Sequence, residues 1–428
     1  MHKVVTFLGI LRPQPQPAIR PQSTEYSYSG KTYSGQVFAE ALRQFLGDFD
    51  QMLVFVTEGA YKNTYPVLDA LHDERIRPVH IPNGETTEEM WTTFEAVTNA
   101  VDEGDTVTFD ITHGLRSIPF LVFLAAAFLK SAKQVTIQAI YYGAFELNKD
   151  ASGAPRPAPV IELTDFVSLL DWLNASNQFV CLGDASPLAA QLFAAQPHYT
   201  LRKQDDVARQ QSKQLSDAAG ALNSVSLALR LILPDQVMEA SHKLQGTLLG
   251  ATAATRQWAR PFTVLAEQVA HAYEPLGLSD PHAEENRVTS LSKELAMVRW
   301  YLDRNLIVQA VVLGREWLVT WGVVQAGLGN PYDNKTVRDE VEKAFGAASS
   351  GRGHYPDHVF SSGRCLHGLP SQEQAIRLFG QLGEVRNTLC HANKRLDQQK
   401  AQGLEKNARK WCQELNDLPI SDLQHASP

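Results

Sequence analysis

The stretch that decides the fold is Asp110-Ile-Thr-His-Gly-Leu-Arg-Ser-Ile-Pro119, which joins two apolar segments through a polar turn. Before it, residues 106–109 (Thr-Val-Thr-Phe) have the alternating, β-branched pattern of a strand. After it, residues 119–129 are almost entirely apolar and begin with proline, as the first turn of a buried helix does. A strand, a polar turn and a helix in this order predict an α/β fold with a ligand-binding edge at the turn.

The turn itself carries groups that bind anions. The amino terminus of a helix offers unpaired N–H groups and the positive end of the helix dipole. Thr112, His113, Arg116 and Ser117 add side-chain donors. An ordinary turn, in which Asp110 caps and the helix starts at Ser117, fits the residue types about equally well.

Outward from this turn, the first 165 residues alternate apolar strands with amphipathic helices. Strands are expected near residues 3–10, 52–57, 77–82, 105–111 and 134–143, and helices near 35–46, 60–74, 86–102 and 117–131. Such a βαβ series predicts a doubly wound, mostly parallel sheet, which residues 159–163 close as a hairpin partner of the strand at 135–142. Residues 11–34 are expected to form a long loop at the same sheet edge as the turn.

Beyond residue 163 the pattern changes to helical spacing with almost no strand signal, so a second domain begins there. Domains are therefore expected at residues 1–165 and 166–428. The expected helices are 164–176, 187–195, 203–233, 235–249, 253–273, 286–303, 306–326, 335–346, 371–395 and 401–416.

Composition narrows the class of protein. The 428 residues are 44% hydrophobic and carry a formal charge of −8, which argues against a protein that coats nucleic acid non-specifically. Four cysteines without paired spacing suggest no disulfide framework and a reducing compartment. The first residues read as a strand rather than a signal peptide, and the apolar run at 118–129 is too short for a bilayer. We therefore expect a cytoplasmic protein without a membrane partner.

A second set of reactive groups lies at Arg386-Asn-Thr-Leu-Cys-His391, in a segment whose apolar residues mark one helical face. Five residues turn through about 500°, so Arg386 and His391 flank that face roughly 140° apart. A helix of this kind that faces a second copy of itself would place two such sets in one pocket. Metal-independent RNA cleavage needs a proton acceptor, a proton donor and a positive charge on the phosphorane, which histidine and arginine supply.

The spacing alone is weak evidence. Arg75-Ile-Arg-Pro-Val-His80 has it too, although Pro78 prevents a continuous helix there. In the alternative interpretation, Arg386 is solvated and His391 lies at the edge of a core. A rival zinc site would use His354, His358, Cys365 and His367, but the spacing matches no closed zinc motif, and we expect no metal.

Taken together, the two stretches resemble CRISPR-associated ribonucleases that join a CARF (CRISPR-associated Rossmann fold) domain to a HEPN domain. The resemblance is to the branch with an Asp-x-Thr-His-Gly signature, which Asp110-Ile-Thr-His-Gly114 matches. It extends from the first strand with Gly9, through Val54-Phe-Val-Thr-Glu-Gly-Ala60, to the Arg386 segment. Residues 11–22, rich in proline and glutamine, depart from the family pattern by lengthening the first loop.

The resemblance implies a homodimer, or a higher oligomer, that binds cyclic oligoadenylate, most often cyclic tetra-adenylate, as an allosteric activator and not as a cofactor. A two-fold ring suits the two-fold axis of a dimer. The residues implied at that site are Gly9, Thr57, Glu58, Ala60, Thr112, His113, Gly114, Arg116 and Ser117. In the HEPN domain, Arg386 would stabilise the phosphorane, His391 would handle protons and Asn387 would assist. Residues 306–316 resemble the partner helix, from which Glu316 would orient Arg386 by a salt bridge.

The sequence thus predicts an activator-dependent, metal-independent endoribonuclease that cleaves single-stranded RNA in type III CRISPR antiviral defence. Two alternatives stay open. One is a ligand-sensing DNA-binding regulator without nuclease activity, although no helix-turn-helix or basic stripe supports it. The other is a sensor that also degrades its cyclic activator.

Overall fold

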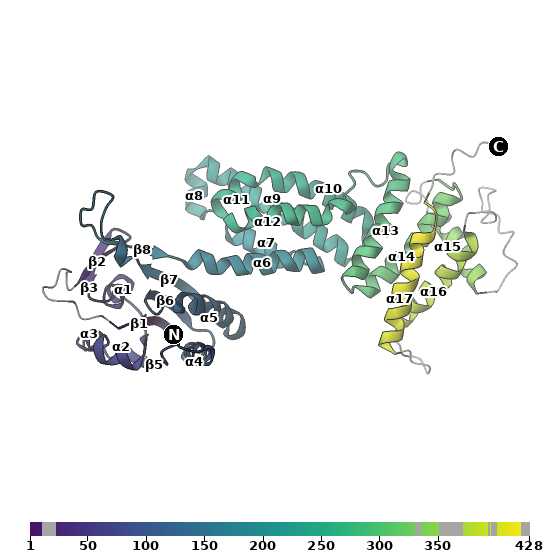
Figure 1. The fold of residues 1–428 in the computed structure, drawn as a ribbon. Coiled ribbons are helices and arrows are strands. Elements are labelled where there is room, and N and C mark those ends of the chain that lie inside the picture. Colours follow the sequence, from purple (N-terminus) through teal and green to yellow (C-terminus); the bar gives the residue numbers. More distant parts are fainter. Residues whose placement is uncertain (11–22, 330–334, 351–370, 393, 395–399, 421–428) are drawn as a thin grey trace. The chain divides into compact units, whose positions relative to one another are not determined.

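A computed structural model describes residues 1–10, 23–329, 335–350, 371–392, 394 and 400–420 of the chain (Figure 1). The chain divides into two compact units, Met1–Asp171 and Trp172–Pro428. The boundary lies within one helix, α6 (Thr164–Leu182). The first unit is α/β and the described part of the second is helical, which confirms the predicted fold class.

The first unit is built on an eight-stranded mixed sheet in the order β3-β2-β8-β7-β6-β1-β4-β5. The strands are β1 (His2–Leu8), β2 (Thr24–Tyr28), β3 (Lys31–Gly35), β4 (Gln51–Val56), β5 (Ile76–His80), β6 (Thr106–His113), β7 (Thr136–Gly143) and β8 (Ala158–Glu162). From β7 to β5 all neighbours are parallel, and β8 pairs antiparallel with β7 as expected. The chain winds from β1 towards β5 and then from β6 towards β7, so the winding direction reverses between β1 and β6.

Helices cover both faces of this sheet. They are α1 (Phe38–Leu46), α2 (Glu58–Asn63), α3 (Pro66–Asp69), α4 (Thr87–Asn99) and α5 (Ile118–Lys133). Successive residues of β1 serve opposite cores: Val4 packs with Phe38 of α1 and Leu68 of α3, whereas Val5 packs with Val97 of α4 and Val122 of α5. Strands buried on both faces are continuous apolar runs, which is why β1 and β4 were readable in the sequence.

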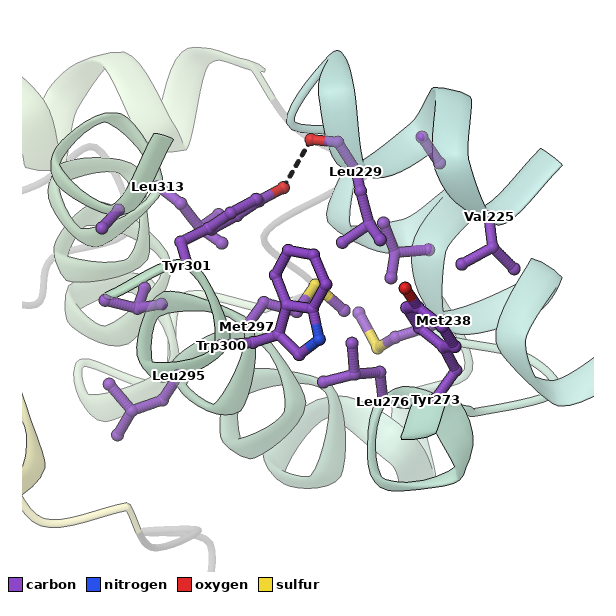
Figure 2. Packing of buried hydrophobic residues seen from close by; sticks show 14 of the residues in the cluster. Val225, Leu229, Met238, Tyr273, Leu276, Leu295, Met297, Trp300, Tyr301 and Leu313 are labelled. Atoms are coloured by element: carbon purple, nitrogen blue, oxygen red, sulfur yellow. Dashed lines mark hydrogen bonds between the residues drawn. The ribbon is translucent and has the colours of Figure 1, made fainter. Parts of the chain in front are cut away.

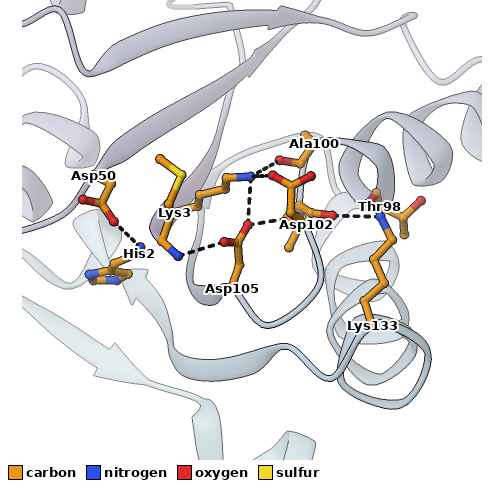
Figure 3. Close-up of polar contacts among 10 residues, drawn as sticks. His2, Lys3, Asp50, Thr98, Ala100, Asp102, Asp105 and Lys133 are labelled. Carbon is orange, nitrogen blue, oxygen red and sulfur yellow. Dashed lines mark hydrogen bonds and ion pairs between the residues drawn. The ribbon is translucent and has the colours of Figure 1, made fainter.

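The amino-terminal ends of the strands are closed by a polar network (Figure 3). The Lys3 ammonium lies 2.6 Å from a carboxylate oxygen of Asp102 and 2.8 Å from one of Asp105. Burial alone would lower the pKa of Lys3, but these two carboxylates outweigh it and the pKa is raised. The amino-terminal edge is thus occupied by structural ion pairs, and the carboxyl-terminal edge remains for a ligand.

Two sequence expectations in this unit were wrong. The loop expected at 11–34 includes residues 11–22, which lie outside the described residues. It is wrong for its described part, because residues 24–35 form an antiparallel hairpin of β2 and β3. Its two-residue turn is Ser29-Gly30, and both residues have positive φ, as a type I′ turn requires. The helix expected at 60–74 is divided into α2 and α3, with proline at the start of the second.

The second unit consists of helices in its described residues. They are α7 (Ser186–Ala194), α8 (Tyr199–Gln204), α9 (Asp206–Arg230), α10 (Pro234–Gly250), α11 (Thr252–Trp258), α12 (Arg260–Tyr273), α13 (Arg287–Asp303), α14 (Ile307–Gln325), α15 (Lys335–Ser349), α16 (Gln372–Cys390) and α17 (Ala401–Glu414). The helices expected at 203–233 and 253–273 are each divided: Asp205 caps α9, and Ala259 separates α11 from α12.

A continuous apolar core holds these helices together. Figure 2 shows one part of it, where Trp300 lies among Met238, Leu276 and Tyr273. The Tyr301 hydroxyl in this core donates to the carbonyl of Leu229 at 2.6 Å, so a buried polar group is satisfied. Helix α14 is long and apolar enough for a membrane span by length and composition, but 67% of it is buried, with Trp317 and Trp321 fully inside. Among the described residues it is a core helix.

Candidate functional site

The first candidate site lies where the winding of the sheet reverses, at the carboxyl ends of β1 and β6. In open α/β sheets, ligands bind at this point because the loops after the two strands diverge. The pairing of β1 with β6 is irregular here: Thr6 lies opposite Asp110 and Leu8 opposite His113, so β6 contains one extra residue. This bulge re-aims Thr112 and His113 at the end of the strand.

Asp110 anchors the turn from inside the sheet. It is fully buried, and its carboxyl group accepts a hydrogen bond from the Thr6 hydroxyl at 2.6 Å and one from the Thr112 N–H at 2.8 Å. Burial raises the pKa of Asp110, although both threonines act against this shift. Because it is fully buried, Asp110 is out of reach of a ligand, and it acts by fixing Thr112. It does not cap α5, in contrast to the ordinary-turn interpretation.

Thr112 and His113 link the end of β6 to its neighbours. The Thr112 hydroxyl accepts from the N–H of Gly143 at 2.8 Å, and the His113 Nε2 atom accepts from the N–H of Phe38 at 2.9 Å. An accepting Nε2 requires a lone pair, so the imidazole is neutral with its proton on Nδ1. Burial lowers the pKa of His113 in agreement with this form. Its ring also stacks on Phe145, with centroids 5.5 Å apart.

Gly9 is required by close packing of the two strand ends. A Cβ atom at Gly9 would lie 2.7 Å from the carbonyl oxygen of His113, closer than real contacts allow. Its own carbonyl accepts from the Thr64 hydroxyl at 2.8 Å. Gly9 thus lies beside His113, and its lack of a side chain lets the strand ends approach.

Helix α2 begins directly after β4, the neighbour of β1 in the sheet. The Thr57 hydroxyl caps this helix by accepting from the N–H of Ala60 at 3.3 Å, and Ala60 is buried. Glu58 is exposed and pairs with Lys62 at 2.8 Å. Thr57 and Ala60 therefore shape the backbone of this helix start.

The turn after β6 leaves its polar residues accessible. Gly114 follows the strand, Arg116 and Ser117 are exposed, and α5 begins at Ile118. The Ser117 side chain makes no capping hydrogen bond. An anion at this turn would meet exposed Arg116 and the positive end of the dipole of a 16-residue helix, whose first N–H group, that of Ile118, already donates to the carbonyl of Leu115.

Sequence reasoning missed the residues that support this site from elsewhere in the fold. Thr6 had a readable signal, because it is a polar residue inside an apolar strand. Phe38, Thr64 and Gly143 act through backbone atoms or from distant loops, and nothing in their local sequence marks them. Phe145 likewise becomes visible only through its stacking on His113.

The second candidate site lies on α16. Arg386 and Asn387 line a cavity of about 1010 Å³. The Arg386 Nη1 atom donates to the Asn387 side-chain oxygen at 2.9 Å. Within the described part of the chain, Arg386 makes no salt bridge, so its charge stays available. Helix α16 ends at Cys390, and His391 is exposed as the residue that follows it. His391 is therefore not a core residue.

One expected contact is wrong. Glu316 does not pair with Arg386; its carboxylate oxygens lie 3.1 Å from Arg315 and 3.2 Å from Arg338. Arg315 is the adjacent residue on α14, and Arg338 lies on α15.

The described residues contain no cluster of three or more histidine, cysteine or acidic side chains that would hold a metal ion. The rival zinc set, His354, His358, Cys365 and His367, lies outside the described residues.

The fold and sites define a two-part protein: a Rossmann-like α/β unit with a polar edge suited to an anion, followed by a helical unit with an arginine-lined cavity. No known family model matches the chain. Over 108 residues, 24% of this chain, it is 29% identical to the CRISPR-associated protein MJ1674 of Methanocaldococcus jannaschii. The match spans 16% of that relative's length.

Among solved structures, the chain is similar to Enterococcus italicus Csm6 bound to cyclic hexa-2′-fluoro-hexa-dAMP. The TM-score is 0.40 and the identity 10%, over 97% of this chain and 93% of that one.

Proposed function

We propose that this chain is a CRISPR-associated endoribonuclease of the CARF–HEPN kind, switched on by a cyclic oligoadenylate. The observation that carries the proposal is the placement of two side chains at the end of α16. Arg386 lines a large cavity and has no carboxylate partner among the described residues, and His391, five residues later in the sequence, is exposed. The partial likeness to a CRISPR-associated protein supports the cellular setting.

The α/β unit is the proposed sensor. Its site combines the helix start of α5, exposed Arg116 and a rigid strand end anchored by Asp110. These groups suit a phosphodiester ring. Such a ring, with its two-fold symmetry, would contact Gly9, Thr57, Thr112 and their neighbours in each of two copies of the chain.

The helical unit is the proposed nuclease, and the chemistry follows from its side chains. The ribose 2′-OH of single-stranded RNA attacks the adjacent phosphorus, and the 5′-oxygen leaves. Products are a 2′,3′-cyclic phosphate and a 5′-OH end. Arg386, held by Asn387, stabilises the negative charge on the phosphorane, and His391 transfers protons. No step requires a metal ion.

The test is cleavage of labelled single-stranded RNA with and without cyclic tetra-adenylate, in the presence of a metal chelator. We expect activator-dependent cleavage that His391→Ala lowers by about 10²–10⁴-fold. Activator binding should persist in that variant. Cys390→Ala, at the exposed neighbouring position, is the matched control and should cleave normally.

The same assay separates the alternatives. Retained cleavage in His391→Ala, or cleavage that needs Mg²⁺, would refute the mechanism. Binding of labelled duplex DNA without RNA cleavage would favour the regulator. Loss of the cyclic activator in the presence of His391→Ala would show that the sensor unit degrades it.

A further inference from the structure

Arg315 of α14 is a largely buried cation in the helical unit, and the proposed reaction leaves it unused. Its side chain is 12% exposed, and its guanidinium group lies over the Phe379 ring, 4.5 Å from the centroid. Two nitrogens donate to carboxylates, Nη1 to Glu316 at 3.1 Å and Nη2 to Glu342 at 2.6 Å. A guanidinium group has five N–H donors, so three remain after these two bonds.

Arg315 and Arg386 line the same cavity. Gly383 lies on α16 between Phe379 and Arg386, and a Cβ atom built on it would stand 3.9 Å from the Arg315 Nε atom. The absence of a side chain at Gly383 therefore leaves the Nε edge of Arg315 open towards α16. Arg386 follows Gly383 by about one helical turn on α16, and both arginines are among the lining residues of the cavity.

The side chains that line the cavity include three arginines, Arg315, Arg377 and Arg386, and two glutamates. The two carboxylates that bind Arg315 are not among the residues lining the cavity. Their two hydrogen bonds fix the orientation of the Arg315 guanidinium group. Arg377 also lines the cavity but is bound to Glu414 at 2.7 Å, and the lining carboxylates are Glu373 and Glu384.

We infer that Arg315 binds a phosphate of the RNA substrate next to the one that Arg386 contacts, and that Gly383 keeps this phosphate site open. The inference rests on the proposed function. Arg315 is then a positioning residue: its stacking on Phe379 and its two ion pairs pre-organise the guanidinium group, so little entropy is lost when the phosphate binds. Its loss should raise KM for RNA more than it lowers kcat.

The experiment measures binding of a 20-nucleotide single-stranded RNA to the full chain over a range of KCl concentrations, with His391→Ala as the parent to prevent cleavage. Adding Arg315→Gln should weaken binding about tenfold, as expected for a lost charged hydrogen bond. It should also lower the slope of log K against log salt by about 0.7, the value for one phosphate contact on a single strand. A purely structural role for Arg315 would leave that slope unchanged.

Arg338→Gln is the matched control. Arg338 pairs with the same Glu316 carboxylate and donates to Thr320 at 2.9 Å, but it does not line the cavity. We expect Arg338→Gln to lower the melting temperature of the protein. Its affinity for RNA and its salt slope should equal those of the parent. Equal effects of Arg315→Gln and Arg338→Gln on the slope would overturn the inference.

Gly383→Leu keeps every ion pair and tests the open site in a second way. Leucine is a better helix former than glycine, so folding should not suffer, and its side chain would enter the space beside the Arg315 Nε atom. Affinity for RNA should fall as in Arg315→Gln. Unchanged affinity in Gly383→Leu would overturn the inference and leave the proposed function intact, whereas absence of activator-dependent cleavage in the unmodified chain would overturn the proposed function itself.

Discussion

Replacement of Asp110 tests whether this buried carboxyl group anchors the sensor site through its shape rather than its charge. Asp110→Ala removes the acceptor of two buried donors, the Thr6 hydroxyl and the Thr112 N–H. Each donor left without a partner costs about 1–3 kcal/mol, so the free energy of unfolding of the α/β unit should fall by about 2–6 kcal/mol. In a unit of this size that corresponds to a melting temperature lower by roughly 5–20 °C.

Asp110→Asn should behave differently. Its carbonyl oxygen can still accept from Thr112, and its amide nitrogen can donate to the oxygen of the Thr6 hydroxyl. Burial raises the pKa of Asp110 in the folded state above its value in the unfolded chain. The free energy of unfolding of the wild type therefore falls as the pH rises through the folded-state pKa. Asparagine does not titrate, so the stability of Asp110→Asn relative to wild type should be greatest at pH 8 and should decline towards pH 4.

Scanning calorimetry of the full chain at pH 4, 6 and 8 would measure these differences, because it resolves the transitions of separate units. Binding of cyclic tetra-adenylate should be retained in Asp110→Asn and weakened in Asp110→Ala, since only the first keeps Thr112 in place. If Asp110→Asn lost as much stability as Asp110→Ala at pH 8, the carboxylate charge would be essential and the reasoning would be refuted.

Three further predictions concern the same site. Burial lowers the pKa of His113, so as the pH falls the unfolded chain binds a proton at this residue before the folded chain does. The free energy of unfolding of the α/β unit should therefore fall as the pH drops below about 6.5. His113→Ala lacks this titration, and calorimetry should show that its melting temperature depends less on pH. Gly9→Ala should cost about 1–3 kcal/mol, because its Cβ would lie 2.7 Å from the His113 carbonyl oxygen, and a melting temperature equal to wild type would contradict the close packing. Arg116→Ala should weaken binding of cyclic tetra-adenylate by about 10-fold or more in calorimetric titration, with the melting of the helical unit unchanged, and unaltered affinity would place the activator elsewhere.

Much of the fold was readable because its main signals are local. Strands buried on both faces are uninterrupted apolar runs, and β1, β4 and β6 were found close to their true bounds. The errors arose where the signal was short or was interrupted. The β2–β3 hairpin lies in a polar segment, and its Ser29-Gly30 turn was not recognised. Pro66 and Asp205 end helices inside segments whose apolar spacing continues past them.

By itself, the sequence determined which residues reach the carboxyl edge of the sheet and that Arg386 lies on a helix, because both follow from element order and helical periodicity. His391, expected on the same helix at 371–395, instead follows its end at Cys390. Partners distant in the chain were decided only by the tertiary structure. Thr6 meets Asp110 because β1 and β6 are neighbours in the sheet, and Phe38 meets His113 because α1 packs beside the end of β6. Glu316 pairs with Arg338 of α15, 22 residues further on, and with its neighbour Arg315, because packing brings Arg338 within 3.2 Å of its carboxylate. The sequence did not show this, since the distance between helices is set by their packing.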